Sequence, residues 1–219
     1  MGTNEVLILM TTAALVGVAH TLLGPDHYLP FIALARARRW TNSKALRITI
    51  LCGICHVLSS VLIGTAGLMF GIAVLRLEIF EAVRGNVAGW LLFGFGLAYT
   101  AWGLRYAFRK KLPQPSDANA NAADTSTTPW ILFIIFVFGP CEPLIPIFMY
   151  PAANASLMGV VAVTSVFCLF TVGTMVTIVY ASLKGFAVLP KRIRLGNYAH
   201  AAAGFTILLC SAGMQIFGL

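Results

Sequence analysis

The sequence predicts an all-α integral membrane protein with six transmembrane helices. Of its 219 residues, 59% are hydrophobic and 10% are charged, whereas soluble domains carry about 25% charged residues. Six apolar segments recur along the chain, and a bilayer-spanning helix needs roughly 20 such residues. The segments cover residues 6–23 with a continuation at 28–34, then 48–68, 87–106, 130–150, 157–183 and 198–217.

The first and fourth segments each contain a Gly-Pro pair followed by a second proline. Proline removes a backbone hydrogen-bond donor and clashes with the preceding helical turn, so a broken helix is expected at both places. The residues of the two predicted breaks are Gly24, Pro25, Pro30, Gly139, Pro140 and Pro146.

Positive charge is concentrated in alternate loops. The first, third and fifth loops hold five, four and four of the 15 Lys and Arg, and the second loop holds Arg76 and Arg84. The positive-inside rule therefore predicts a multi-pass protein of the cell (inner) membrane with both termini outside. Residues 112–129, rich in Pro, Ser, Asn and Asp, are expected to form a flexible cytoplasmic linker. Residues 71–83 fit a short interfacial helix loosely.

The two halves of the chain resemble each other. The stretch Gly24–Pro30 is similar to Gly139–Pro146, and Gly85-Asn86 is similar to Gly196-Asn197. Since each half has three spans, the halves would enter the membrane in opposite directions. We therefore expect a 3+3 inverted-topology repeat, with repeats at 1–111 and 130–219 in one membrane domain.

Most coordinating side chains of the spans lie at or near the two breaks. Ionisable groups at membrane depth are costly and mark functional sites. Imidazole and carboxylate suit first-row transition ions, and a thiolate shifts the preference to softer ions. Helix packing, a proton relay and an apolar filler role for the cysteine remain alternatives. The candidate metal ligands are His20, Asp26, His27, His56, Cys141 and Glu142.

Hydroxyl groups on the second and fifth segments form a weaker pattern. Ser59 and Ser60 follow His56, and Thr171 and Thr174 lie three residues apart. Such a stripe is typical either of helix packing or of the wall of a hydrophilic path.

The sequence lacks the motifs of several other functions, or has them in an unsuitable place. It has no Gly-x4-Gly-Lys-Ser/Thr loop, so we expect no nucleotide-binding site. No Ser-His-Asp or HExxH arrangement occurs, so we expect neither an enzyme nor a prosthetic group. Cys52-x-x-Cys55-His56 matches the haem-attachment pattern, but it lies inside a span. The net charge of +8 follows from membrane topology and does not indicate nucleic acid. Met1–Glu5 is uncharged apart from Glu5, so no cleaved signal peptide is expected.

The motifs resemble those of known carriers. His20-x4-Pro25-Asp26-His27 is similar to the signature of NicO-type nickel/cobalt permeases. Gly24-Pro-Asp-His-Tyr-Leu-Pro30 with Gly53-x-x-His56-x-x-Ser59-Ser60 resembles UreH-like and sulfite exporter-like membrane proteins. Gly139-Pro-Cys-x4-Pro146 resembles the breaks of CcdA-type thiol-reductant carriers. These families belong to one broad superfamily of small inverted-repeat carriers.

The resemblance implies transport of a divalent metal ion, with nickel or cobalt favoured and His20, Asp26, His27 and His56 as ligands. Cys141 and Glu142 are further candidate ligands, inferred from the similarity of the second break to the first. The ion would bind near the membrane midplane and move by alternating access, in a direction that the sequence leaves open. The expected partners are lipid and the ion, and a homo-oligomer is left open. The alternatives are a CcdA-like thiol-disulfide carrier, an anion (sulfite-type) exporter and a scaffold for metalloenzyme assembly.

Overall fold

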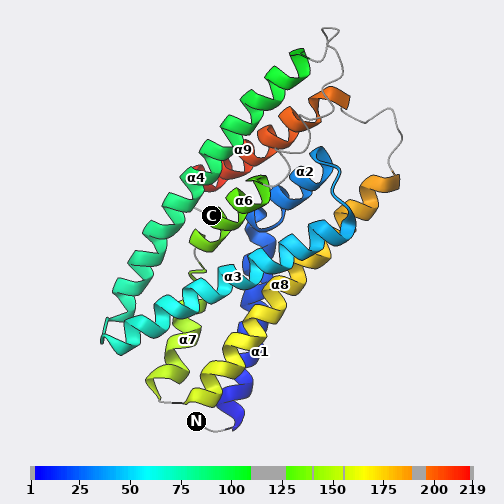
Figure 1. Ribbon diagram of the computed structural model, residues 1–219. Helices are drawn as coiled ribbons and strands as arrows, with labels where there is room; N and C mark the ends of the chain where they lie inside the picture. Colours follow the sequence, from blue (N-terminus) through cyan, green and yellow to red (C-terminus); the bar gives the residue numbers. More distant parts are fainter. Residues whose placement is uncertain (1–2, 110–126, 140, 155, 189–195, 218–219) are drawn as a thin grey trace.

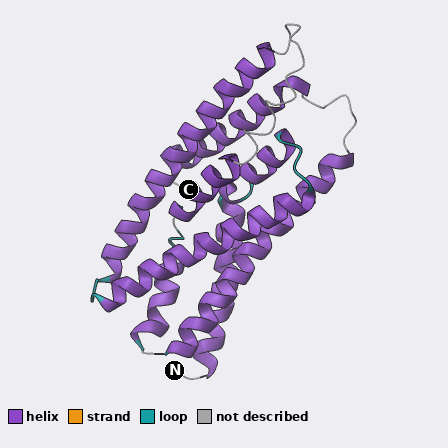
Figure 2. Cartoon of the chain, viewed as in Figure 1, coloured by secondary structure: helices purple, strands orange, loops and turns teal. Residues whose placement is uncertain are grey.

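Helices make up most of the described chain. The structure, a computed structural model, describes residues 3–109, 127–139, 141–154, 156–188 and 196–217, and no strand occurs within them (Figure 2). Five helices there are long and apolar enough to cross a membrane. They are α1 (Thr3–Leu23), α3 (Asn42–Met69), α4 (Val74–Arg109), α8 (Leu157–Val188) and α9 (Ala199–Phe217). The prediction of a helical chain is confirmed, and the length and apolar composition of these five helices are compatible with a membrane protein.

Shorter helices flank the two expected breaks. α1 ends at Leu23, a 3-10 turn η1 covers Pro25–His27, and α2 covers Leu29–Ala37. The second break separates α6 (Thr127–Phe138) from α7 (Leu144–Ala153). α6 has 12 residues and α7 has 10, so neither reaches the roughly 20 residues of a full span. Pro140 and most of the expected linker, residues 110–126, lie outside the described residues.

α4 differs from its prediction. Residues 71–83 were expected to form a separate interfacial helix, but 74–109 form one helix of 36 residues. Its buried positions recur every three or four residues, which is the period of one helical face. They are Leu77, Glu81, Arg84, Ala88, Gly89, Leu92, Gly96, Tyr99, Gly103 and Ala107. The face that contacts the protein therefore continues through Glu81 and Arg84, and these two charges do not end the helix.

The helices form two packed pairs joined by α3. α4 lies along α9 and α1 lies along α8, while α3 crosses from α8 toward the start of α4 (Figure 1). α2 packs on α9, α6 packs on α3, and α7 packs on α3 and α8. A second short 3-10 element, η3 (Gly196–Tyr198), precedes α9.

Two apolar clusters meet near the breaks. One cluster contains Phe31, Cys52 and Phe136, and the other contains Val57 and Cys141. Residues 52 and 57 flank His56 on α3, and residues 136 and 141 flank the α6–α7 break. His56 and this break therefore lie at the boundary between the two apolar clusters.

The outer faces of the helices remain apolar. On α1, the exposed fractions of Leu7, Leu15 and Leu23 are 63%, 67% and 68%. An exposed apolar surface of this extent is unfavourable in water and is expected for helices that face lipid.

Candidate functional site

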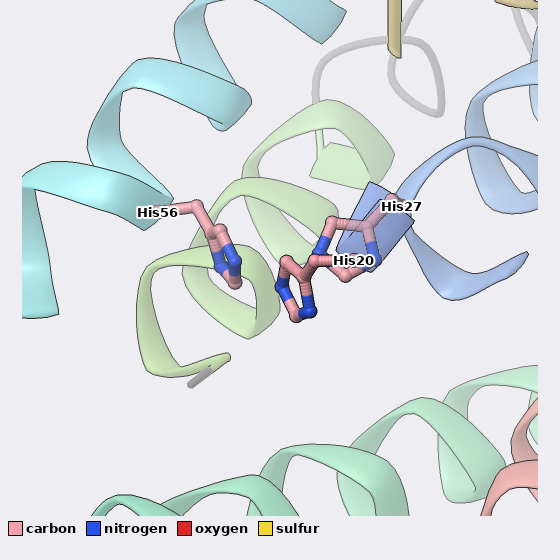
Figure 3. A group of neighbouring side chains, drawn as sticks. All are labelled: His20, His27 and His56. Atoms are coloured by element: carbon pink, nitrogen blue, oxygen red, sulfur yellow. The ribbon is translucent and has the colours of Figure 1, made fainter. Parts of the chain in front are cut away.

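Three histidines converge beside the first break. His20 comes from the last turn of α1, His27 from η1 and His56 from the middle of α3 (Figure 3). The ring centroids of His20 and His27 are 4.6 Å apart, and those of His27 and His56 are 5.1 Å apart. One ring nitrogen from each residue lies within 4.8 Å of the other two. We call these residues the histidine triad.

The Gly-Pro break brings two of the three imidazoles together. The amide of Gly24 donates to the carbonyl of His20 at 3.0 Å, which closes the last turn of α1. Pro25 then starts the 3-10 turn, and the amide of His27 donates to the carbonyl of Gly24 at 3.1 Å. A continuous helix would separate residues 20 and 27 by about two turns, or 10.5 Å at a rise of 1.5 Å per residue. The break therefore allows their rings to meet.

The Nδ1 atoms of His27 and His56 are held by hydrogen bonds to oxygen. Nδ1–H of His27 donates to Oδ1 of Asp26 at 2.9 Å and to the carbonyl of Gly24 at 3.0 Å. Nδ1–H of His56 donates to the carbonyl of Phe136 at 3.2 Å. A carbonyl oxygen can only accept, so the proton of each neutral ring is on Nδ1 and the lone pair is on Nε2. Metal-binding histidines are oriented by such contacts.

The Nε2 atoms of the triad are buried without a partner. Within the described chain, Nε2 of His20, His27 and His56 makes no hydrogen bond. Only 3% of His27 and 3% of His56 is exposed. Leaving one buried acceptor unsatisfied costs about 1–3 kcal/mol. For His27 and His56 this nitrogen carries the lone pair, and a metal ion held by one ring nitrogen of each triad residue would satisfy it.

The other predicted ligands have different surroundings. Asp26 bonds His27 and thereby orients it. Cys141 is buried, and its backbone amide donates to Oγ of Ser60 and Oε2 of Glu81, each at 3.2 Å. Glu142 lies in a surface groove of about 540 Å³ that Glu78 also lines. Neither Cys141 nor Glu142 belongs to the histidine triad.

Both break glycines lie against a triad imidazole. A Cβ placed on Gly24 would lie 2.5 Å from Nδ1 of His27, and one on Gly139 would lie 3.1 Å from Nδ1 of His56. Residue 24 has φ −92° and ψ 90°, which any residue can adopt. The glycine is therefore required for space. The two later prolines lie in the first turns of the following helices, Pro30 in α2 and Pro146 in α7.

The predicted stripe of hydroxyl groups does not line one continuous path, because its members have different surroundings. Oγ of Ser59 donates to the carbonyl of His56 at 2.7 Å, and Oγ of Ser60 donates to Oε2 of Glu81 at 2.9 Å. Thr171 is fully buried on α8, and its Oγ1 has no partner among the described residues. Thr174 donates to the carbonyl of Phe170 and lines a surface groove of about 460 Å³.

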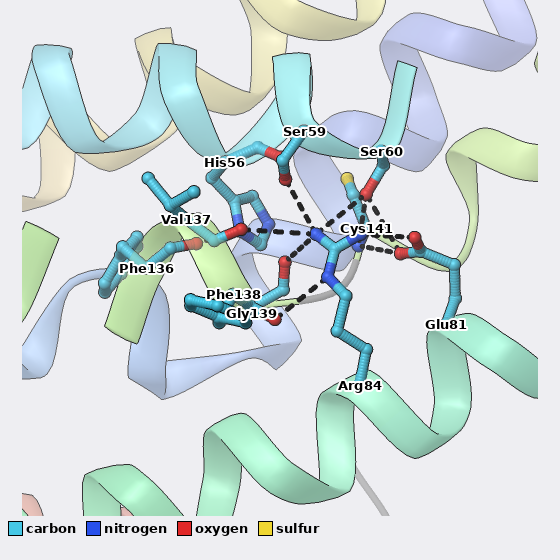
Figure 4. Close-up of polar contacts among 10 residues, drawn as sticks. All are labelled: His56, Ser59, Ser60, Glu81, Arg84, Phe136, Val137, Phe138, Gly139 and Cys141. Carbon is cyan, nitrogen blue, oxygen red and sulfur yellow. Dashed lines mark hydrogen bonds and ion pairs between the residues drawn. The ribbon is translucent and has the colours of Figure 1, made fainter. Parts of the chain in front are cut away.

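Glu81 and Arg84 form a buried ion pair that was not predicted from the sequence. Glu81 is fully buried and 9% of Arg84 is exposed. Nη1 of Arg84 contacts Oε1 of Glu81 one turn away on α4. The guanidinium reaches the end of α6, across the second break (Figure 4). Their i, i+3 spacing next to a long apolar run was a signal, but Glu81 was assigned to the short interfacial stretch 71–83 and Arg84 to the second loop.

The comparisons with known proteins identify no relative. The chain matches no protein-family model, and searches of curated proteins and of solved structures find no significant match.

Proposed function

We propose that this protein is a membrane permease for a divalent transition-metal ion, with the histidine triad as its binding site. The observation that carries the proposal is the set of three buried Nε2 atoms without a partner, at least two of which belong to rings held by Nδ1–H bonds to oxygen. Neutral imidazole is a common ligand of nickel, copper, zinc and iron. The preference for nickel or cobalt rests on the sequence resemblance.

The proposed mechanism is alternating access between two inverted repeats of three spans, with α6 and α7 together as the fourth span. Exchanging α1, α2, α3 and α4 with α6, α7, α8 and α9 turns the contact of α1 with α8 into that of α6 with α3. It also turns the contact of α2 with α9 into that of α7 with α4, and all four contacts occur. This exchange supports a pseudo-two-fold axis between the halves.

The proposed site uses imidazole ligands oriented by a carboxylate. Asp26 supplies the negative charge that favours a bound cation and disfavours an anion. Cys141 and Glu142 are left out of this ligand set because they lie outside the triad. The thiol-disulfide alternative has less support, since the first break carries Asp26 and His27 at the positions where such a carrier needs a cysteine.

The test compares all four histidines in purified protein reconstituted in lipid nanodiscs. Nickel and cobalt binding is measured by titration and elemental analysis for His20→Ala, His27→Ala, His56→Ala and His200→Ala. The first three variants are expected to lose binding. His200, whose ring contacts Trp102 on α4, lies outside the triad and serves as the matched control. Binding that survives all three triad substitutions, or no binding by the wild type, would reject the proposal.

Flux measurements test the transport half of the proposal. Proteoliposomes with an entrapped metal-sensitive dye should show nickel or cobalt entry with wild-type protein and with His200→Ala. His27→Ala should reduce the rate to that of empty liposomes. Binding without flux would make the protein a metal-binding scaffold and not a permease.

A further inference from the structure

The Glu81–Arg84 pair holds both sides of the second break. The last carbonyls of a helix have no partner within the helix and need donors from elsewhere. Arg84 supplies them: Nε donates to the carbonyl of Phe138 at 3.0 Å, and Nη2 donates to those of Gly139 at 2.6 Å and Val137 at 3.4 Å. The positive guanidinium is also favourable at the negative end of the α6 dipole.

Glu81 contacts the α7 side of the same break. Its Oε2 accepts from the backbone amide of Cys141 at 3.2 Å and from Oγ of Ser60 at 2.9 Å. A carboxylate is favourable near the amides that precede a helix, and α7 begins at Leu144. The ion pair therefore joins the end of α6, the approach to α7 and α3.

Two contacts connect this ion pair to His56. The first runs through α6, because the carbonyl that accepts from Nδ1–H of His56 belongs to Phe136, the residue before Val137. The second runs through Ser59, whose Oγ accepts from Nη2 of Arg84 at 2.7 Å and donates to the carbonyl of His56 at 2.7 Å. Figure 4 shows the Ser59 hydroxyl and the Val137 carbonyl both bonded to the guanidinium.

We propose that Arg84 is a positioning residue for the histidine triad: it fixes the last turn of α6 and Ser59, and thereby keeps His56 in the Nδ1–H tautomer with Nε2 free to bind. The part that concerns metal affinity rests on the proposed function. The part that concerns the tautomer of His56 is independent of any metal.

The variants must distinguish a loss of His56 positioning from unfolding of the protein. Removing Arg84 alone leaves Glu81 buried without its partner, which is strongly destabilising. The double variant Glu81→Gln/Arg84→Met removes the donors and leaves no unpaired charge. Arg84→Lys keeps the charge but cannot reproduce the planar fork that serves several carbonyls. Arg76→Met, at an exposed position of the same helix, is the matched control.

The primary measurement is the nitrogen-15 NMR spectrum of labelled imidazoles in metal-free protein, with His56 assigned through His56→Asn. Wild type and Arg76→Met should show His56 in the Nδ1–H tautomer alone. The double variant should show mixed tautomers, and Arg84→Lys should fall between these results. A folded double variant with an unchanged His56 signal would overturn the proposal.

Cobalt titration of the same samples gives the second measurement. Loss of an orienting contact commonly weakens metal binding 10- to 100-fold, so a loss of about tenfold is expected for the double variant, with a changed visible absorption spectrum of bound cobalt. Unchanged affinity and spectrum, with mixed tautomers, would overturn the metal part of the inference. If wild type binds no cobalt, the proposed function fails and the tautomer measurement alone decides the role of Arg84.

Discussion

Gly24 and Asp26 show how single residues prepare the triad. Asp26 orients His27 through Nδ1, and Gly24 leaves the space that the imidazole occupies. Both act on the side of the ring opposite Nε2. The atom available for binding is therefore determined by residues that do not contact the proposed ion.

Gly24→Ala is expected to weaken metal binding and lower the thermal unfolding temperature. The added methyl group would lie 2.5 Å from Nδ1 of His27 and 2.9 Å from Oδ1 of Asp26, so the imidazole must move. Overpacking of this kind costs about 1–3 kcal/mol. Gly94→Ala is the control, because no neighbour lies within 4 Å of its Cβ position. Equal unfolding temperatures and affinities in both variants would contradict the steric argument.

Asp26→Asn is expected to weaken nickel or cobalt binding about 10- to 100-fold while the protein stays folded. The substitution preserves shape but removes the negative charge of the group that accepts the hydrogen bond from Nδ1–H of His27. Isothermal titration measures the affinity, and circular dichroism checks the helix content. A folded variant with wild-type affinity would show that the carboxylate does not support the ligand.

Close helix contacts through glycine explain how the α4–α9 pair forms. A Cβ on Gly204 would lie 2.9 Å from Cα of Thr100, and one on Gly103 would lie 2.8 Å from Cα of Ala201. Small residues allow two backbones to approach in a membrane, where packing drives association. α4 also carries Glu81 and Arg84, so the packing of α4 on α9 helps to position the ion pair that contacts the second break.

Gly204→Ala should therefore destabilise the protein by about 1–3 kcal/mol, since its new methyl group meets the backbone of α4 at Thr100 as well as the hydroxyl of that residue. Thermal unfolding in detergent gives the comparison. Gly213→Ala, on the same helix with no neighbour within 4 Å, should leave the unfolding temperature unchanged or raise it. A similar loss in both variants would place the effect outside the α4–α9 contact.

Element-scale features were predictable where the signal was local. Gly24-Pro25 marks its break directly, and the nearby His20 and His27 mark the first part of the triad. The i, i+3 spacing of Glu81 and Arg84 indicated a possible ion pair, but the continuity of α4 and the burial of the pair were not predictable from neighbouring residues. The carbonyls of Phe138 and Gly139 that bind Arg84 are 54 and 55 residues away in the chain. In a sequence, a charged residue near the end of a span usually indicates the membrane–water interface. Only tertiary contacts distinguish such a residue from a buried, paired one.

At the scale of the whole molecule, the helices have apolar outer faces, and two apolar clusters inside enclose a small polar centre. The triad and the Glu81–Arg84 pair are linked through Phe136 and Ser59, so the two breaks share one polar centre between the apolar clusters. A carrier needs such a centre, because half-helix ends and charged groups are satisfied there away from lipid.

The proposed orientation predicts opposite labelling of two sites. In intact cells, a membrane-impermeant maleimide should label Asn4→Cys, because the positive-inside rule places the N-terminus outside. Asp117→Cys, in the Pro- and Asn-rich stretch between the halves, should react only after the cells are permeabilised. The reverse pattern would invert the topology, and labelling of both sites in intact cells would reject an odd number of spans between them.

X-ray absorption at the metal edge tests the central claim most directly, because it counts the ligands of the bound ion. Nickel- or cobalt-loaded wild type should show the scattering of three imidazole rings, with metal–nitrogen distances near 2.1 Å. His200→Ala should give the same spectrum, and any metal retained by His27→Ala should show fewer imidazoles. A loaded wild type without imidazole scattering, or a spectrum unchanged by His27→Ala, would contradict the histidine triad as the binding site.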